Sequence, residues 1–342
     1  PSLYAGRVNP RKLADAGLTD REKAEAANFP GLNRAIAGEY PPGSTFKPVT
    51  ALAAMQEHLL QPYDYLTCTS SITIAGQPFN NWKPSYEAMD LPRALEESCD
   101  TFFYQLGYAF YRLPGYRGQP LQRWARRFGF GQTPGLDIGG QSSGILPTYR
   151  WKQETFKGDP VEETWLPGNS IQLSIGQQYL RVTPLQMARF YALIANGGHL
   201  VRPHVAEQAG VLDNRGRFSE TLWRFTPRPP GPPLVDPQAL RIVKDGLFQA
   251  THGVYGTATA VFGDYPIPIA GKTGTAEMVV DGQMRDQSWW CGYGPAENAR
   301  LVVCAVIENG GHGGTAAAPA AFEVFQEFFK RPAEVEPATN SD

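Results

Sequence analysis

The stretch Gly43-Ser44-Thr45-Phe46-Lys47 constrains the fold more than any other part of the sequence. Pro41 and Pro42 precede it and end any earlier element, whereas the apolar run after Lys47 is typical of a buried helix. Residues three positions apart lie on one helix face, so Ser44 and Lys47 are expected to point the same way. A desolvated lysine loses its proton more easily and can activate a serine as nucleophile. The start of the helix would add backbone N–H groups for an oxyanion.

Two later motifs point to the same chemistry. A Ser-x-x-Lys spacing is common, and alone it is better explained as a helix cap followed by a solvated lysine. However, Ser98-Cys99-Asp100 stands at the start of an amphipathic stretch, and Lys272-Thr273-Gly274-Thr275 follows the apolar segment Ile267–Gly271. This trio, in this chain order, is the motif set of serine β-lactamases and penicillin-binding proteins. The chain therefore resembles the transpeptidase domain of class B penicillin-binding proteins, and most of all the penicillin-binding protein 2 group that acts in cell elongation.

The resemblance implies a catalytic role for each residue of the first two motifs. Ser44 would attack a carbonyl and form an acyl-enzyme, Lys47 would take its proton, and Ser98 would relay a proton to the departing amine. Asp100 occupies the third place of a Ser-x-Asn motif, which is a departure from the commonest pattern. An aspartate there could hold Lys47 or Lys272 as a cation, so the sequence leaves open which lysine is neutral.

The third motif is expected to bind substrate. By resemblance, Lys272, Thr273 and Thr275 would bind the carboxylate that ends the donor peptide, with Gly274 between them. The backbone N–H groups of Ser44 and Thr275 would form the oxyanion hole. The structural alternative for this motif is an ordinary edge strand with a bulge glycine.

The reaction implied by the resemblance is D,D-transpeptidation. The enzyme would cleave a terminal D-Ala–D-Ala bond in a peptidoglycan stem peptide and pass the acyl group to an amine on a neighbouring strand. β-Lactam antibiotics resemble that terminus and are expected to acylate Ser44. The resemblance implies no cofactor and no metal. Two other classes stay open: a serine carboxypeptidase or β-lactamase that passes the acyl group to water, and a non-catalytic β-lactam sensor.

Composition limits the partners and the setting. The 342 residues carry a net charge of −2, which gives no argument for binding nucleic acid. No apolar run approaches the ~20 residues needed to span a bilayer. The family is normally anchored in the bacterial inner membrane by one N-terminal helix and carries a pedestal before a periplasmic catalytic domain. We expect both to be absent from this chain, which we interpret as a fragment. In the full-length protein, the resemblance implies a SEDS-family glycan polymerase and other elongation proteins as partners.

The predicted fold class is α+β. An antiparallel sheet flanked by helices is expected beside a mostly helical subdomain, as in the serine β-lactamase and penicillin-binding-protein fold. Residues 1–330 would form the transpeptidase domain, with the helical region at 51–250 and the sheet plus a C-terminal helix at 251–330. Residues 331–342 are expected to be a disordered tail.

Strand and loop patterns refine this expectation. The segments Ile267–Val280, Ser288–Gly294 and Leu301–Glu308 are predicted as consecutive strands, with Asp281-Gly282 as a two-residue turn. Ile72-Thr73-Ile74 suggests a separate small hairpin. Residues 201–233, with their proline-rich end, are predicted to be extended and loop-forming.

The chain has four cysteines: Cys68, Cys99, Cys291 and Cys304. They lack a C-x-x-C spacing, so a zinc framework is not expected. If the last two strands turn between Glu297 and Asn298, Cys291 and Cys304 lie directly opposite each other on one sheet face. A disulfide needs Cβ atoms at ~3.5–4.5 Å, which most directly opposed pairs miss. We therefore predict that these cysteines pair in register but remain unbonded thiols.

Overall fold

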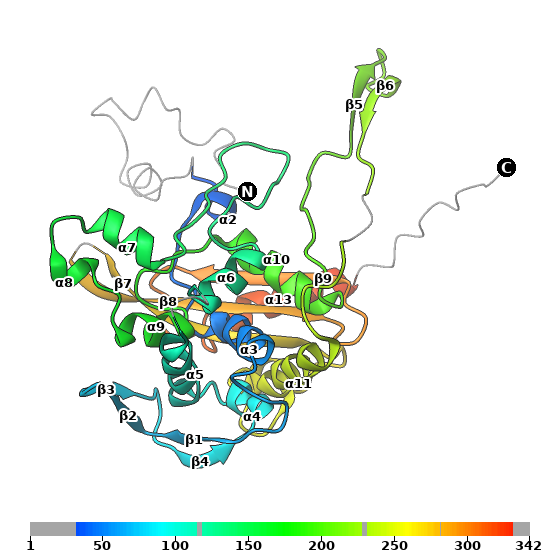
Figure 1. Cartoon of the computed structure of the whole chain (residues 1–342). Helices are drawn as coiled ribbons and strands as arrows, with labels where there is room; N and C mark the ends of the chain where they lie inside the picture. Colours follow the sequence, from blue (N-terminus) through cyan, green and yellow to red (C-terminus); the bar gives the residue numbers. More distant parts are fainter. Residues whose placement is uncertain (1–31, 115–117, 228–230, 281, 331–342) are drawn as a thin grey trace, which may run out of the picture.

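A computed structural model describes residues 32–114, 118–227, 231–280 and 282–330. Within these ranges an antiparallel sheet packs against a mostly helical region, which is the α+β arrangement predicted from the sequence (Figure 1). The predicted disordered tail at 331–342 lies outside the described residues. Within the described part of the chain, no helix has both the length and the apolar character that a membrane span requires.

The central sheet has the strand order β7-β8-β9, with both pairs antiparallel. Its strands are β7 (Ala270–Val280), β8 (Gln283–Gly294) and β9 (Leu301–Ile307). The prediction of three consecutive strands is confirmed. β8 begins at Gln283, earlier than predicted, because residues 283–287 pair with residues 276–280 of β7.

The two faces of the sheet pack against different helices. Trp289, Cys291 and Tyr293 of β8 lie in the core that the sheet shares with the helical region. Trp290, between them, packs instead against Phe325 of the C-terminal helix α13 (Ala317–Lys330). This alternation follows from the two-residue period of a strand. Lys272 pairs with Cys291, so its side chain is on the face toward the helical region.

The helical region lies on the face of the sheet opposite α13 (Figure 1). Its longer helices begin at residues that the sequence supports as starts, such as Thr183 with its capping box before Pro184. The helices before the sheet are α2 (Arg34–Ala37), α3 (Lys47–Gln56), α4 (Leu91–Glu96), α5 (Asp100–Arg112), α6 (Pro120–Arg127), α7 (Tyr149–Thr155), α8 (Pro160–Glu163), α9 (Pro167–Ser174), α10 (Pro184–Ala195), α11 (Pro237–His252) and α12 (Thr259–Phe262), together with the 3₁₀ turn η2 (Gly43–Phe46).

Three small two-stranded sheets complete the described structure. The predicted hairpin around residues 72–74 is confirmed as β2 (Ser71–Ile74) and β3 (Gln77–Asn80), and β1 (Leu66–Thr69) pairs with β4 (Tyr86–Met89) beside it. Residues 201–233 were predicted as extended and loop-forming, and the pairing of two strands within this segment was not predicted. This segment contains the hairpin β5 (Gln208–Leu212) and β6 (Phe218–Arg224), which projects from the body (Figure 1). Its strands are mostly exposed, so they lack the alternating apolar pattern of a half-buried strand.

All four cysteines are in disulfides. Cys291 and Cys304 are directly opposite in the ladder, as predicted, but the prediction that they remain thiols was wrong. Their Cα atoms are 4.1 Å apart, closer than the ~4.5 Å of a closely spaced antiparallel pair, and this brings the sulfur atoms within bonding reach. The second disulfide, Cys68–Cys99, was not predicted.

Candidate active site

The first motif forms a tight turn that leads directly into a buried helix. Ser44 lies in η2, and Lys47 is the first residue of α3, with Pro48 tolerated in the first turn. Ser44 is half-buried and Lys47 is fully buried. Gly43 precedes them with a φ of +54°, and a Cβ there would lie 2.5 Å from the carbonyl oxygen of Thr275. Glycine therefore allows the serine turn to pack directly against β7.

The second motif lies at the junction of α4 and α5. Ser98 occupies the junction with a φ of +57°, and Asp100 is the first residue of α5. The cap of α5 is Cys99, whose Sγ accepts a hydrogen bond from the backbone N–H of Phe102. Asp100 is therefore not needed as the cap, and its side chain is available for a different partner.

Lys47 joins the first two motifs. Its Nζ donates to the carbonyl oxygen of Ser98 at 2.6 Å, to Ser98 Oγ at 3.1 Å and to Asp100 Oδ1 at 2.7 Å. Burial lowers the pKa of Lys47, and the carboxylate of Asp100 opposes that effect. Of the two lysines that the sequence left open, the one in contact with Asp100 is Lys47.

The third motif approaches from the sheet. Lys272 is fully buried, and its Nζ donates to the carbonyl oxygen of Thr273 at 3.2 Å. Its pKa is lowered well below the ordinary value by burial and then by the charge of Lys47, while Asp100 acts in the opposite direction. Gly274 is a point of close approach, because a Cβ there would lie 2.9 Å from the carbonyl oxygen of Pro42.

Two threonines of this motif lie on the other face of β7, one strand period apart. Thr273 Oγ1 shares a hydrogen bond of 2.6 Å with Thr257 Oγ1, and Thr275 Oγ1 accepts one of 3.3 Å from the backbone N–H of Gly313. The Thr275 carbonyl oxygen accepts a hydrogen bond from Gln177 Nε2 at 3.2 Å. Thr257 and Gln177 were not predicted from the sequence, because their positions depend on loops between distant elements.

A separate hollow of about 510 Å³ lies near the C-terminal end of α5 and the start of α6, with Phe110, Leu121 and Tyr149 among its lining residues. No residue of the three motifs lines it. The three motifs, by contrast, come from three separate parts of the fold, which are η2 with the start of α3, the α4–α5 junction and β7, and they meet around Lys47. We therefore place the candidate active site at the motifs.

Three motifs meet around buried lysines: a nucleophile turn, a Ser-x-Asp junction and a Lys-Thr-Gly-Thr strand. This set of motifs defines the class of serine enzymes and receptors that react with penicillin. The match to protein families agrees with this class. The model for the penicillin binding protein transpeptidase domain matches residues 8–329, and the chain belongs to that family.

Individual relatives support a more specific similarity. Peptidoglycan D,D-transpeptidase MrdA of Haemophilus influenzae is 30% identical over an alignment of 321 residues that covers 88% of this chain and 46% of that protein. The MrdA of Acinetobacter baumannii is 32% identical over an alignment of 348 positions that covers 93% of this chain and 45% of that protein. The crystal structure of Pseudomonas aeruginosa PBP2 with WCK 5153 has a TM-score of 0.76 and 31% identity, covering 95% of this chain and 70% of that one. The chain thus spans about half the length of the curated relatives it matches.

Proposed function

We propose that this chain is the catalytic part of a peptidoglycan D,D-transpeptidase that works through an acyl-enzyme on Ser44. The observation that carries the proposal is the placement of Lys47. It follows Ser44 by three residues at the start of α3, and its Nζ contacts Ser98 and Asp100. Family membership supports the same reaction class. The similarity to MrdA proteins, which are named for this activity, supports the specific reaction.

Acylation would begin when neutral Lys47 takes the proton of the Ser44 hydroxyl. Ser44 Oγ then bonds to the carbonyl carbon of the penultimate D-Ala, and the bond to the terminal D-Ala nitrogen breaks. Ser98 Oγ lies 3.1 Å from Lys47 Nζ, so it can give its proton to the leaving amine and receive one from Lys47. The burial that lowers the pKa of Lys47 favours the neutral form that this step needs.

Substrate recognition would use the sheet side of the site. The terminal carboxylate would bind the hydroxyls of Thr273 and Thr275 together with Lys272 of the same strand. The backbone N–H groups of Ser44 and Thr275 would stabilise the oxyanion. The close packing of Gly43 against Thr275 supports this pairing, because it keeps the two backbones adjacent.

The setting that we propose is the extracytoplasmic side of the bacterial inner membrane. Both disulfides support it, because disulfides persist in oxidising compartments such as the periplasm. A solved structure described as coordination of polymerization and crosslinking by a peptidoglycan synthase complex is 32% identical, with a TM-score of 0.73, and covers 97% of this chain and 54% of that one. It supports a glycan polymerase as the partner of the full-length protein, and the family resemblance implies that this polymerase belongs to the SEDS family.

Reconstitution of the full-length protein with its polymerase and lipid-linked substrate tests the proposal. We expect released D-Ala together with cross-linked stem peptides, and neither product in a Ser44→Ala variant. D-Ala release without cross-links would identify a carboxypeptidase instead. A long-lived penicillin adduct with no D-Ala release from any peptide would identify a sensor.

A further inference from the structure

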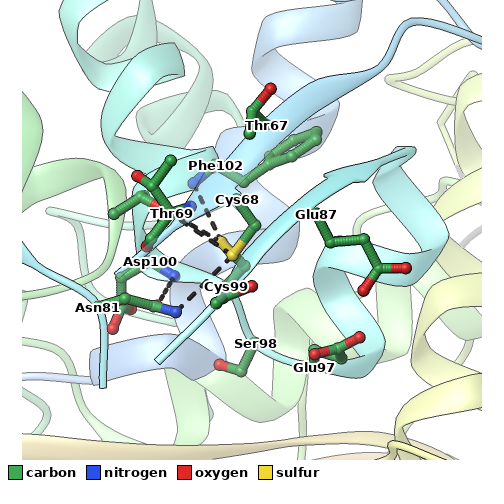
Figure 2. The surroundings of a disulfide bond; sticks show 12 residues. Thr67, Cys68, Thr69, Asn81, Glu87, Glu97, Ser98, Cys99, Asp100 and Phe102 are labelled. Atoms are coloured by element: carbon green, nitrogen blue, oxygen red, sulfur yellow. Dashed lines mark hydrogen bonds between the residues drawn. A yellow bond between two sulfur atoms is a disulfide. The ribbon is translucent and has the colours of Figure 1, made fainter. Parts of the chain in front are cut away.

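The Cys68–Cys99 disulfide lies inside the second motif. Cys99 stands between Ser98 and Asp100, and its sulfur is bonded to Cys68 of β1 (Figure 2). Both cysteines are fully buried. The bond therefore ties the start of α5 to a strand that lies 31 residues earlier in the chain.

Ser98 needs support from its surroundings because its backbone is in the left-handed region. A non-glycine residue there costs on the order of 1–3 kcal/mol and persists only where neighbouring structure holds it. Before Ser98, the end of α4 supplies hydrogen bonds from Ser98 N–H to Leu95 and from Cys99 N–H to Ala94. After Ser98, the chain is fixed by the disulfide. Both the carbonyl and the hydroxyl of Ser98 that contact Lys47 depend on this backbone conformation.

Asn81 reinforces the same junction. Its Oδ1 accepts a hydrogen bond of 2.8 Å from the backbone N–H of Asp100, and its Nδ2 lies 3.7 Å from Cys68 Sγ (Figure 2). Its neighbour Trp82 donates from Nε1 to the carbonyl oxygen of Glu97 at 3.1 Å. The segment 68–83 thus holds the chain on both sides of Ser98, with the disulfide as its covalent connection.

We propose that the Cys68–Cys99 disulfide is a positioning group of the active site, which holds Ser98 and Asp100 where they contact Lys47. The inference rests on the proposed function, because it concerns the groups that prepare Ser44 for acylation. The disulfide does not touch substrate, and its effect passes through the backbone of Ser98 and Asp100. Misplacement of catalytic groups by about 1 Å costs on the order of a hundredfold in rate.

The second disulfide is a matched control. Cys291–Cys304 joins two strands whose backbones are already paired from Ser288 to Gly294. Its removal should leave the backbone of the site in place. Cys68–Cys99, in contrast, joins a strand to the start of a helix, where no ladder runs and the Thr101 hydroxyl bonds to the backbone of Thr69.

The test compares Cys68→Ser/Cys99→Ser with Cys291→Ser/Cys304→Ser by the rate of acylation with fluorescent penicillin across pH. We expect the acylation rate of the first variant to fall roughly ten- to a hundredfold. The acidic limb of its pH–rate profile should lie at lower pH than in the wild type. The limb moves down because Asp100 raises the pKa of Lys47. Lys272 is the other titratable group that interacts with this pair, and the charge of Lys47 lowers its pKa. The control should keep the wild-type limb. A first variant with wild-type rate and limb would overturn the proposal.

Reduction of the folded protein gives an independent result if the first variant does not fold. In the Cys291→Ser/Cys304→Ser background, Cys68–Cys99 is the disulfide that remains, since the chain has four cysteines. Reductant should slow acylation, and reoxidation should restore it. An unchanged rate after the bond is shown by thiol titration to be open would reject the inference. The proposed function itself is rejected by a different result, namely penicillin labelling that survives in Ser44→Ala.

Discussion

Each half of the candidate active site contains a buried lysine, and the two lysines differ in whether a carboxylate contacts them. On the helical side, Lys47 contacts the carboxylate of Asp100 at 2.7 Å. On the sheet side, Lys272 is equally buried, but no carboxylate of the described residues lies within ion-pair distance, and its pKa is lowered further. Burial alone disfavours both cations, so the position of one acid decides which lysine is easier to keep charged.

This difference suggests a division of work. In the proposed mechanism, the helical half would contain the groups that move protons, and the sheet half would present hydroxyls and backbone groups to the substrate. Variants in the helical half should therefore lower the acylation rate at saturating β-lactam. Variants in the sheet half should mainly weaken binding, which appears as a higher concentration for half-maximal rate. The following predictions test this division, from the largest expected effect to the smallest.

Ser44→Ala should abolish labelling by fluorescent penicillin, because it removes the atom that bonds to the acyl group. The variant should keep its melting temperature, since only one half-buried hydroxyl is lost. Gel fluorescence of the purified protein measures the effect. If stoichiometric labelling persisted in this variant, Ser44 would be excluded as the nucleophile, and the helical half would not supply the acylated group.

Lys47→Arg should lower the acylation rate by orders of magnitude. Arginine keeps the charge but does not deprotonate near neutral pH, so it cannot accept the serine proton. Lys152→Arg is the control, because Lys152 is also buried but bonds to Thr164 and Asn169, away from the motifs. Equal rates for the Lys47 variant and the wild type would exclude Lys47 as the base.

Thr275→Val should reduce acylation efficiency at least about tenfold. The change keeps the shape of the side chain but removes a hydroxyl, and a lost hydrogen bond to a charged group costs about 1.5–3 kcal/mol. The same variant should lose much less with a β-lactam analogue that lacks the carboxylate. If both compounds lose equally, Thr275 does not recognise the carboxylate, and the division between the halves fails at this residue.

The smallest effect concerns the pH dependence of stability. Because the pKa of Lys272 in the folded protein lies well below its ordinary value of 10.5, the unfolded chain binds more protons between those two pKa values. The free energy of unfolding should therefore rise with pH across that window. Lys272→Met should flatten the rise, as measured by urea midpoints at several pH values. An unchanged slope would mean that Lys272 is not the source.

Sequence reasoning predicted the parts of the site that chemistry constrains and missed the parts that depend on three-dimensional packing. Ser44 and Lys47 are three residues apart, and the predicted helix after Ser44 is present, with Lys47 as its first residue. Their place in a catalytic site was predicted from the resemblance of the three motifs to a known set and stays a prediction. The three consecutive strands of the main sheet were also predicted, because turn residues separate their apolar segments in the sequence. The Cys68–Cys99 bond was not, because its ends are 31 residues apart and no periodic pattern connects them. The exposed hairpin β5–β6 was missed for the opposite reason, since it buries too little to leave a pattern.

The central claim is that Ser44 carries the acyl group, and mass spectrometry after reaction with a penicillin tests it most directly. The intact protein should gain the mass of one penicillin. Peptide mapping should place that mass on the fragment that contains Ser44, and fragmentation should assign it to the serine oxygen. An adduct on any other residue, or no covalent adduct at saturating penicillin, would contradict the account.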